Sequence, residues 1–309
     1  MSEVLTFIPQ WQILIFSGLF GAAWGSFANV VIARWPLEMS VVRPGSHCFS
    51  CQAKVRPWDN IPVLSYFILR GKCRHCGASF SLRYVFVELL LALFSVAVMQ
   101  RALALYPDAP GWLLGTWLIW FAFIWALVVV AMIDLACWLI PDSIVLPGIA
   151  VGVAANALGL LPLGWLEPVV AAGIAYAGLR LLFIDGYQLL TGKPGMGLGD
   201  AKLLALFGAF LGYEGTLFAL FAGAFQGLVV GLGMVLFRRR KGLDNEPVFE
   251  EDLGEDGAPT EPTDDRLRKA KVPFGPFLAA GAIEYLFVGE ALIAHYTKWV
   301  FYLTLRWFS

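Results

Sequence analysis

The sequence predicts an all-α polytopic membrane protein with about eight transmembrane helices and one small cysteine-bearing insertion. Of its 309 residues, 59% are hydrophobic and 15% are charged, and the mean hydropathy is +0.72. A soluble core of this size could not bury so much apolar surface. Apolar stretches of about 20 residues recur, which is the length a helix needs to cross the hydrocarbon core. No long alternation of apolar and polar residues indicates a β-barrel.

The expected spans are separated by short polar connections and by one long charged segment. Residues 1–10 contain no Lys or Arg, so they lack the basic region of a cleaved signal peptide, and we expect the first helix to remain as an anchor. The spans are predicted at 11–33, 84–99, 112–133, 143–161, 169–184, 201–211, 215–237 and 272–293. The predicted divisions are a first transmembrane helix (1–34), a cytoplasmic insertion (35–83), a transmembrane core (84–237), a charged linker (238–271) and a last helix with an interfacial tail (272–309).

The insertion carries four of the five cysteines, in two CxxC pairs. Cys48 and Cys51 form the first pair, and Cys73 and Cys76 form the second after 21 intervening residues. This spacing is a little longer than is usual for a paired-knuckle zinc site. Four thiolates can close a tetrahedral Zn²⁺ ion against substrate, so we predict a structural zinc. Two disulfides or idle thiols are the alternatives, and the surrounding basic residues favour a reducing cytoplasm, where structural disulfides are rare.

The positions of the charges orient the chain. Lys and Arg cluster in 34–83, at Lys193 and Lys202, and at 238–241, whereas the opposite connections carry Asp108, Glu167 and Glu214. The positive-inside rule therefore makes the basic side cytoplasmic and puts both termini outside. Residues 244–265 contain ten acidic residues and no basic ones. Such a block is typical of a solvated tether, and electrostatic steering of a basic ligand is the alternative.

Two acids at the ends of apolar segments are the candidate catalytic residues. Asp134 follows 112–133, and Asp200 ends the run Gly195-Met196-Gly197-Leu198-Gly199-Asp200. In the predicted topology both lie on the cytoplasmic side. A carboxylate at a bilayer boundary is a functional-site hypothesis by default. Two carboxylates that converge in a poorly solvated site cannot both ionise readily, so one stays protonated while the other is ionised. An aspartyl protease uses two carboxyl groups in these two states, one as the base and one as the acid.

A third acid, Asp142, lies on the same side. It follows Pro141 and precedes an apolar segment, so we expect it to cap the next helix through its side-chain oxygen. Asp200 could equally cap its own helix, and its glycines could simply permit a tight turn. The GxGD pattern alone is therefore a weak signal.

Two further features concern helix packing. Gly21, Gly25 and Ser26 form a small-residue face on the first span, where another helix backbone could approach closely. Glu88 lies inside the second span, where it must face the bundle interior, reach the interface or find a partner.

Taken together, these motifs resemble the bacterial type IV prepilin peptidases, and the resemblance covers nearly the whole chain. It rests on 25–31, on the paired knuckles with 59–62 and 69–71 between them, on 81–84 with 87–88, on 133–134 with 139–142, on 195–202 and on 273–276. The family's two catalytic aspartates fall on Asp134 and Asp200. Phe49 stands where the family usually has proline, and the acidic insert is longer than usual.

The resemblance implies a bifunctional enzyme of the bacterial inner membrane. Such an enzyme removes the short basic leader of type IV prepilins or type II secretion pseudopilins after a glycine. It then methylates the new N-terminal residue with S-adenosylmethionine. No glycine fingerprint of a dinucleotide-type fold assigns the cofactor contacts; Glu88 and residues 25–29 are candidates by resemblance. The expected partners are these substrates and the lipid bilayer, and no nucleic acid.

Three other functions stay open on the sequence. A polytopic transporter would also use intramembrane acids and glycine-broken helices, but no repeat relates the Asp134 and Asp200 regions. A structural assembly protein with a zinc docking domain would need neither acid. A peptidase without methyltransferase activity would need both.

Overall fold

The computed structural model describes residues 8–192, 197–241, 273–289 and 291–298. The predicted acidic insert at 244–265 lies outside these residues, as do Lys193, Gly195 and Met196 and most of the interfacial tail. No β-strand occurs within the described ranges, which confirms the all-α class. The elements are α2 (Gln10–Arg34), η1 (Trp35–Leu37), η2 (Pro57–Asn60), α3 (Leu64–Ile68), α4 (Arg83–Leu105), α5 (Pro110–Cys137), α6 (Asp142–Ala157), α7 (Leu166–Gly178), η3 (Leu179–Asp185), α8 (Gly186–Thr191), α9 (Leu198–Lys241), α10 (Gly275–Glu284) and η4 (Tyr285–Gly289).

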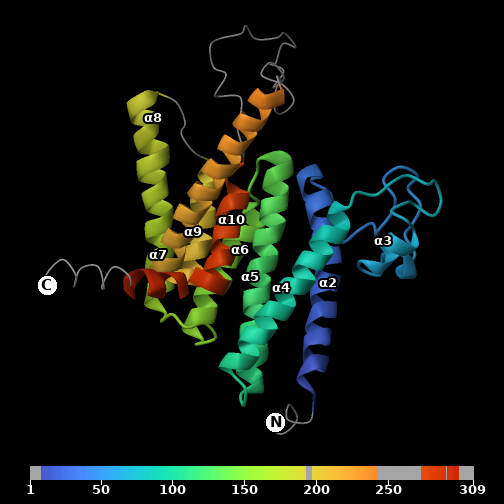
Figure 1. The fold of residues 1–309 in the computed structure, drawn as a ribbon, viewed down its shortest axis with the longest axis horizontal. Helices are drawn as coiled ribbons and strands as arrows, with labels where there is room; N and C mark the ends of the chain where they lie inside the picture. The colour runs from blue at the N-terminus through green and yellow to red at the C-terminus, as the bar shows by residue number, and fades with distance from the viewer. Residues whose placement is uncertain (1–7, 193–196, 242–272, 290, 299–309) are drawn as a thin grey trace, which may run out of the picture.

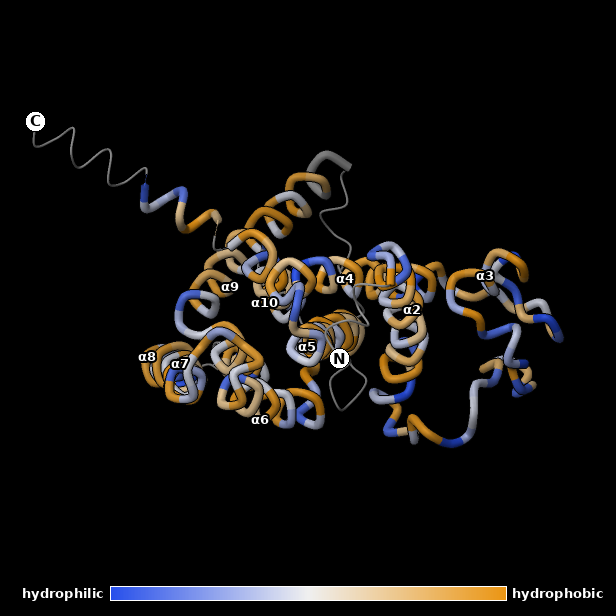
Figure 2. The backbone as a smooth tube through the Cα atoms, turned by 90° about the horizontal axis from the view of Figure 1, so that it is seen from below, coloured by the Kyte–Doolittle hydropathy of each residue, from blue (hydrophilic) through white to orange (hydrophobic). Residues whose placement is uncertain are grey.

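The helices form a bundle organised around α5. Seen from below, α5 lies between α2 and α4 on one side and α6, α7 and α9 on the other, and hydrophobic residues predominate along most of the helices (Figure 2). The small insertion with α3 stands beside α2 and α4 (Figure 1). The four-cysteine insertion therefore falls between the first and second long helices, as predicted.

Five described helices are long and apolar enough to cross a membrane, or six if the bent pair Gly275–Gly289 and Ala291–Lys298 is one span. The number of such helices is below the eight spans that the sequence predicts, for two reasons. The predicted spans 201–211 and 215–237 are counted as one, because α9 joins two helical segments at Gly212, whose backbone (φ +67°, ψ −162°) is not helical. The apolar helix α6 has only 16 residues.

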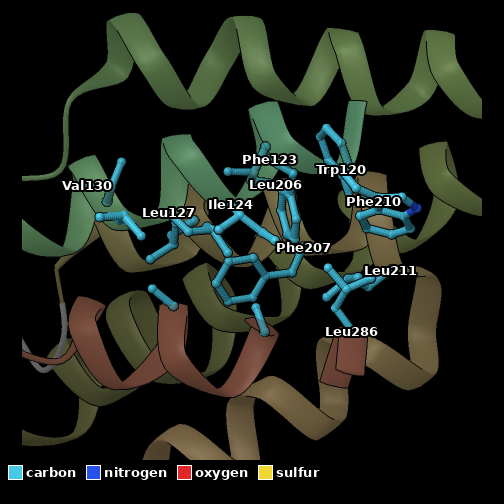
Figure 3. Close-up of a cluster of buried hydrophobic side chains, with 14 of the residues drawn as sticks. Trp120, Phe123, Ile124, Leu127, Val130, Leu206, Phe207, Phe210, Leu211 and Leu286 are labelled. Atoms are coloured by element: carbon cyan, nitrogen blue, oxygen red, sulfur yellow. The ribbon is translucent and has the colours of Figure 1, made fainter. Parts of the chain in front are cut away.

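The core lies where α5 meets α9. Aromatic side chains of α5 point toward those of α9 (Figure 3). The Phe123 and Phe210 rings stack with centroids 4.4 Å apart, and the Phe207 ring meets Phe123 edge-on at 6.4 Å. Aromatic pairs in these arrangements stabilise beyond the area that they bury. The contact fixes the start of α9 relative to the end of α5, where the two candidate acids lie.

The predicted small-residue face on α2 packs against α4. A Cβ atom on Gly21 would lie 2.5 Å from the Leu91 carbonyl oxygen, and one on Gly25 would lie 2.6 Å from the Cα atom of Glu88. Such distances allow only glycine at both positions. The close approach brings Glu88 of α4 against α2 beneath the insertion.

Candidate active site and metal centre

Asp134 lies in the last turn of α5 and is 5% exposed. The helix ends at Trp138, whose backbone is left-handed and whose N–H donates to the Asp134 carbonyl. The Asp134 carboxylate accepts a hydrogen bond from the Gly275 N–H, with Oδ2 and N 3.1 Å apart. A Cβ atom on residue 275 would lie 2.5 Å from that oxygen. The start of α10 therefore holds this carboxylate, and a side chain at position 275 would displace it.

Asp200 lies in the first turn of α9 and is half-buried. Its N–H donates to the Gly197 carbonyl at 3.2 Å, which closes the turn before the helix. A Cβ atom on Gly199 would lie 3.0 Å from that of Ile140. This glycine of the motif thus lets the start of α9 pack against the loop after α5. The N-terminal end of a helix also favours a negative charge.

The two acids line one cavity of about 650 Å³. This volume lies within the usual range for ligand sites, roughly 300–1,000 Å³. The carboxylates are near enough to interact electrostatically. The rest of the lining comes from the start of η1, the loop after α5 and the starts of α6 and α9. It includes Trp35, Trp138, Ile140, Ser143 and Gly199. The structure thus brings together the two acids that the sequence singles out.

Asp142 differs from this pair. It begins α6, and Pro141 occupies the cap position without a side-chain hydrogen bond, so the prediction that Asp142 caps this helix was wrong. Its carboxylate instead accepts from Lys202 Nζ, with both oxygens 2.7 Å away. Lys202 lies one turn into α9 and reaches across the cavity rim to Asp142. This ion pair leaves Asp134 and Asp200 as the carboxylates without a cationic partner in the described part of the cavity.

The four cysteines form one cluster in which all sulfur atoms lie within 4.8 Å of one another. Cys48 and Cys76 are 3.8 Å apart, Cys51 and Cys73 are 4.0 Å apart, and none is in a disulfide. The two knuckles repeat the same turn. The Cys48 N–H donates to Ala53 and the Cys73 N–H donates to Ala78. Phe49, where the family usually has proline, leaves this turn intact.

The electrostatics of the cluster favour a cation. Hydrogen bonds from the backbone N–H groups of Cys51 and Ser50 lower the pKa of the Cys48 thiol to about 6. At Cys76 the Ala78 N–H acts in the same direction, but burial and the neighbouring cysteines outweigh it and raise the pKa to about 11. One thiolate thus forms readily and opposes the next, so a metal ion is what would let all four ionise. The donor set suits zinc.

An ion pair ties the second knuckle to η2. The Arg74 guanidinium donates two hydrogen bonds to Asp59, at 2.9 and 2.5 Å. These bonds hold the pKa of the Asp59 carboxyl below its usual range. The Arg74–Asp59 ion pair therefore stabilises the insertion in addition to the cysteine cluster.

Sequence reasoning missed two groups at the aspartate cavity. The Gly275 N–H lies in the Pro273-Phe274-Gly275-Pro276 run that contributed to the resemblance, but its contact joins residues 141 positions apart. The indole N–H of Trp35 donates to Ser143 Oγ at 3.0 Å and links the end of α2 to α6. Neither contact has a local sequence signal.

Two family models match the chain. The bacterial peptidase A24 N-terminal domain matches residues 19–102, and the type IV leader peptidase family matches residues 121–232. The first range contains the cysteine cluster and Glu88, and the second contains Asp134 and Asp200.

Curated relatives cover almost the whole chain. Proteins named prepilin leader peptidase/N-methyltransferase from Myxococcus xanthus (strain DK1622) and Aeromonas hydrophila are 31% and 34% identical, in each case over 93% of this chain and 92% of the relative. One of the same name from Legionella pneumophila is 31% identical over 96% and 98%. No solved structure matches the chain.

The several apolar helices and the relatives agree on a multi-pass inner-membrane protein. Sequence identity of this level over nine-tenths of both chains, together with the two family models, is enough to assign the family. The chain therefore belongs to the type IV leader peptidase family.

Proposed function

We propose that this chain is a prepilin leader peptidase and N-methyltransferase in which Asp134 and Asp200 carry out the cleavage. The observation that carries the proposal is the single cavity lined by both carboxylates. The names of its relatives support the two activities. The substrates are type IV prepilins or type II secretion pseudopilins, cut after the glycine that ends a short basic leader.

The geometry supports a general acid–base mechanism. One carboxylate of the pair is ionised and takes a proton from a water molecule, whose oxygen attacks the scissile carbonyl carbon. The other carboxyl is protonated and donates to the carbonyl oxygen. The C–N bond then breaks as the leaving nitrogen takes the proton that the first carboxylate removed from water, and the former carbonyl oxygen returns its proton to the second carboxylate. The released amine becomes the new N-terminus. The Gly275 N–H fixes the orientation of Asp134 throughout.

The orientation of the chain belongs to the same proposal. The aspartate cavity faces the cytoplasm, because the basic insertion and Lys202 lie on that side by the positive-inside rule. Both termini are then periplasmic. Residues 84–237 form the peptidase core, 35–83 the cytoplasmic insertion, and 238–271 a cytoplasmic linker.

The four cysteines hold one structural zinc ion in this proposal. The purified protein is therefore expected to contain about one zinc per chain, measured by elemental mass spectrometry. A Cys48→Ser/Cys51→Ser double variant should lose it, whereas Cys137→Ser should keep it, because Cys137 lies at the end of α5 outside the cluster. Substoichiometric metal in a chain whose 43–83 segment resists proteolysis would refute the zinc assignment.

S-adenosylmethionine is the proposed methyl donor. When bound, it supplies an electrophilic methyl group to the amine that cleavage has freed. Incubating the purified chain with a prepilin peptide and this donor should yield a product whose N-terminal residue carries one added methyl group, as seen by mass spectrometry. Cleaved but unmethylated product would reduce the function to a peptidase alone. Uncleaved peptide would refute the peptidase activity, and a peptide that already begins at the mature N-terminus would then decide the methyltransferase activity by itself.

A further inference from the structure

The short helix α3 of the cysteine insertion turns its apolar side chains outward. Leu64, Phe67 and Ile68 are 59%, 63% and 69% exposed, and their spacing places them on one face of the helix. Ser65, by contrast, is buried, and its hydroxyl donates to the Ile61 carbonyl oxygen at 2.7 Å. A helix whose outer face meets water has the opposite arrangement, with polar residues outside. The outer face of α3 therefore matches an apolar surrounding.

Two further exposed side chains lie next to this face. They are Trp58 of η2 and Ile61, which follows η2. The Ser65 hydroxyl ties η2 to α3, because it lies 3.4 Å from the Trp58 carbonyl oxygen as well as 2.7 Å from that of Ile61. Large exposed apolar residues that gather in this way mark a surface that contacts another apolar body. The apolar patch of the insertion is defined here as Trp58, Ile61, Leu64, Phe67 and Ile68.

The insertion reaches down beside the membrane-spanning helices. The Val63 N–H, at the start of α3, donates to Glu88 Oε2 at 2.7 Å. Glu88 lies five residues after Arg83, where α4 begins, which is roughly 8 Å along the helix axis. It also packs against Gly25, which precedes the end of α2 at Arg34 by nine residues, or roughly 13 Å. Figure 1 agrees, since α3 lies lower than the upper ends of α2 and α4.

This depth corresponds to the acyl-chain region of a bilayer. The first span, Gln10–Leu37, has 28 residues and is about 42 Å long, whereas the hydrocarbon core is about 30 Å thick. Shared equally, the excess is about 6 Å at each end. The level of Glu88 therefore falls several ångströms inside the hydrocarbon core. Phe86 and Leu89 of α4, at the same level, are exposed as well, so the apolar patch continues a surface that faces lipid.

The charges around the apolar patch indicate which kind of membrane surface it fits. Residues 35–83 include seven basic and two acidic residues. The Arg56 guanidinium lies over the Trp58 ring, 5.9 Å from its centroid. Arg70 and Lys72 follow α3 within four residues, and neither forms an ion pair with any residue that the structure describes. Cations beside apolar residues fit anionic phospholipid headgroups, whereas they would repel the basic leader of the proposed substrate.

We propose that this surface docks in the lipid of the chain's own membrane. The apolar patch enters the acyl chains of one leaflet, and Arg56, Arg70 and Lys72 bind the phosphates of anionic headgroups. The leaflet is the cytoplasmic one in the orientation proposed above. The insertion is then an interfacial element rather than a free cytoplasmic domain, and the bilayer helps to hold its cysteine cluster against α2 and α4. The inference goes beyond the proposed function and depends on neither catalytic activity.

The test uses the full-length wild-type chain in vesicles of phosphatidylethanolamine and phosphatidylglycerol. A trace of photoactivatable phospholipid carries its reactive group on the acyl chain. Illumination should attach this lipid to the tryptic peptide 55–70, which contains the whole apolar patch because trypsin does not cut between Arg56 and Pro57. The tryptic peptide 84–101 of α4, with Phe86 and Leu89 exposed, is the internal standard. Attachment to the two peptides is expected to agree within about threefold.

A polar variant of the patch, Leu64→Gln/Phe67→Gln/Ile68→Gln, extends the test. Because these side chains project from the insertion, the variant should fold like the wild type, which a thermal melt checks. Lipid attachment to 55–70 should fall about tenfold, while attachment to 84–101 stays unchanged. Val42→Gln is the control, because Val42 is an exposed apolar residue of the insertion outside the patch. This control should change neither yield.

Three results would overturn the inference. If the wild-type chain carries lipid on 84–101 but none on 55–70, the patch meets no acyl chains. Crosslinks between the 55–70 segments of two chains would make the patch an interface between copies. Lipid attachment that saturating prepilin peptide abolishes would make it a substrate-docking surface instead.

The headgroup contact has a measurement of its own on the wild-type chain. The same reactive acyl chain is carried by phosphatidylglycerol in one preparation and by phosphatidylcholine in another. Attachment to 55–70, relative to 84–101, is expected to be about threefold higher from phosphatidylglycerol, and high salt should reduce this preference because exposed charges are screened. Equal attachment from both lipids at low salt would overturn the assignment of Arg56, Arg70 and Lys72 to anionic headgroups.

Discussion

Replacing Asp200 or Asp134 with Asn is expected to lower the rate of leader cleavage by about 10²- to 10⁴-fold or more, while the protein stays folded in the membrane. An amide has nearly the shape of a carboxyl group, but it can neither accept a proton from water nor share one with its neighbour. The loss should appear in kcat, measured with purified enzyme and a prepilin peptide. Methylation of a synthetic peptide that already begins at the mature N-terminus should persist.

Asp142→Asn is the matched control for this pair. Asp142 lines the same cavity, but its carboxylate is exposed and paired with Lys202. Exposed ion pairs contribute little, about 0–1 kcal/mol. The variant should therefore cleave at a rate within a few-fold of wild type, and a loss as large as that of Asp200→Asn would argue against the assignment of the dyad.

Gly275→Ala is expected to have the second-largest effect on cleavage, about 10²-fold, although it removes no catalytic group. The new methyl group would lie 2.5 Å from Asp134 Oδ2, which is closer than atoms can approach. Either the carboxylate or the start of α10 must shift, and a displacement of about 1 Å at a reacting group can cost 10²-fold in rate. Cleavage kinetics and a thermal melt of the same preparation would separate misplacement from unfolding.

Gly227→Ala provides the comparison for that variant. Its Cβ atom would lie 3.6 Å from the Phe277 ring, which is ordinary van der Waals contact on the same pair of helices, α9 and α10. It should cleave normally. If Gly275→Ala also cleaved normally, the close approach of the start of α10 to Asp134 would not be required for catalysis.

Much of the membrane architecture could be predicted from the sequence, because hydrophobic length is a local property. The apolar run before Asp134 predicts a helix, and the structure has that helix at Pro110–Cys137. It extends one turn past the predicted boundary, because the left-handed Trp138 closes it after the acid. The two spans predicted at 201–211 and 215–237 correspond to the two helical segments of α9, which meet at the non-helical backbone of Gly212.

The site was predictable only in part. Asp134 and Asp200 could be chosen because acids next to long apolar runs are rare and costly. The partner of Asp142 could not, because Lys202 lies 60 residues away and the proline before Asp142 suggested a cap instead.

The most direct test of the central claim is a double-variant cycle on the two aspartates. The kcat for leader cleavage is measured for wild type, Asp134→Asn, Asp200→Asn and the double variant, each purified and shown to be folded. If the two carboxylates act as one unit, each single variant should already show nearly the whole loss, and the double variant should be no slower than the singles. A single variant that cleaves at the wild-type rate, or losses that multiply as if the residues were independent, would contradict the account.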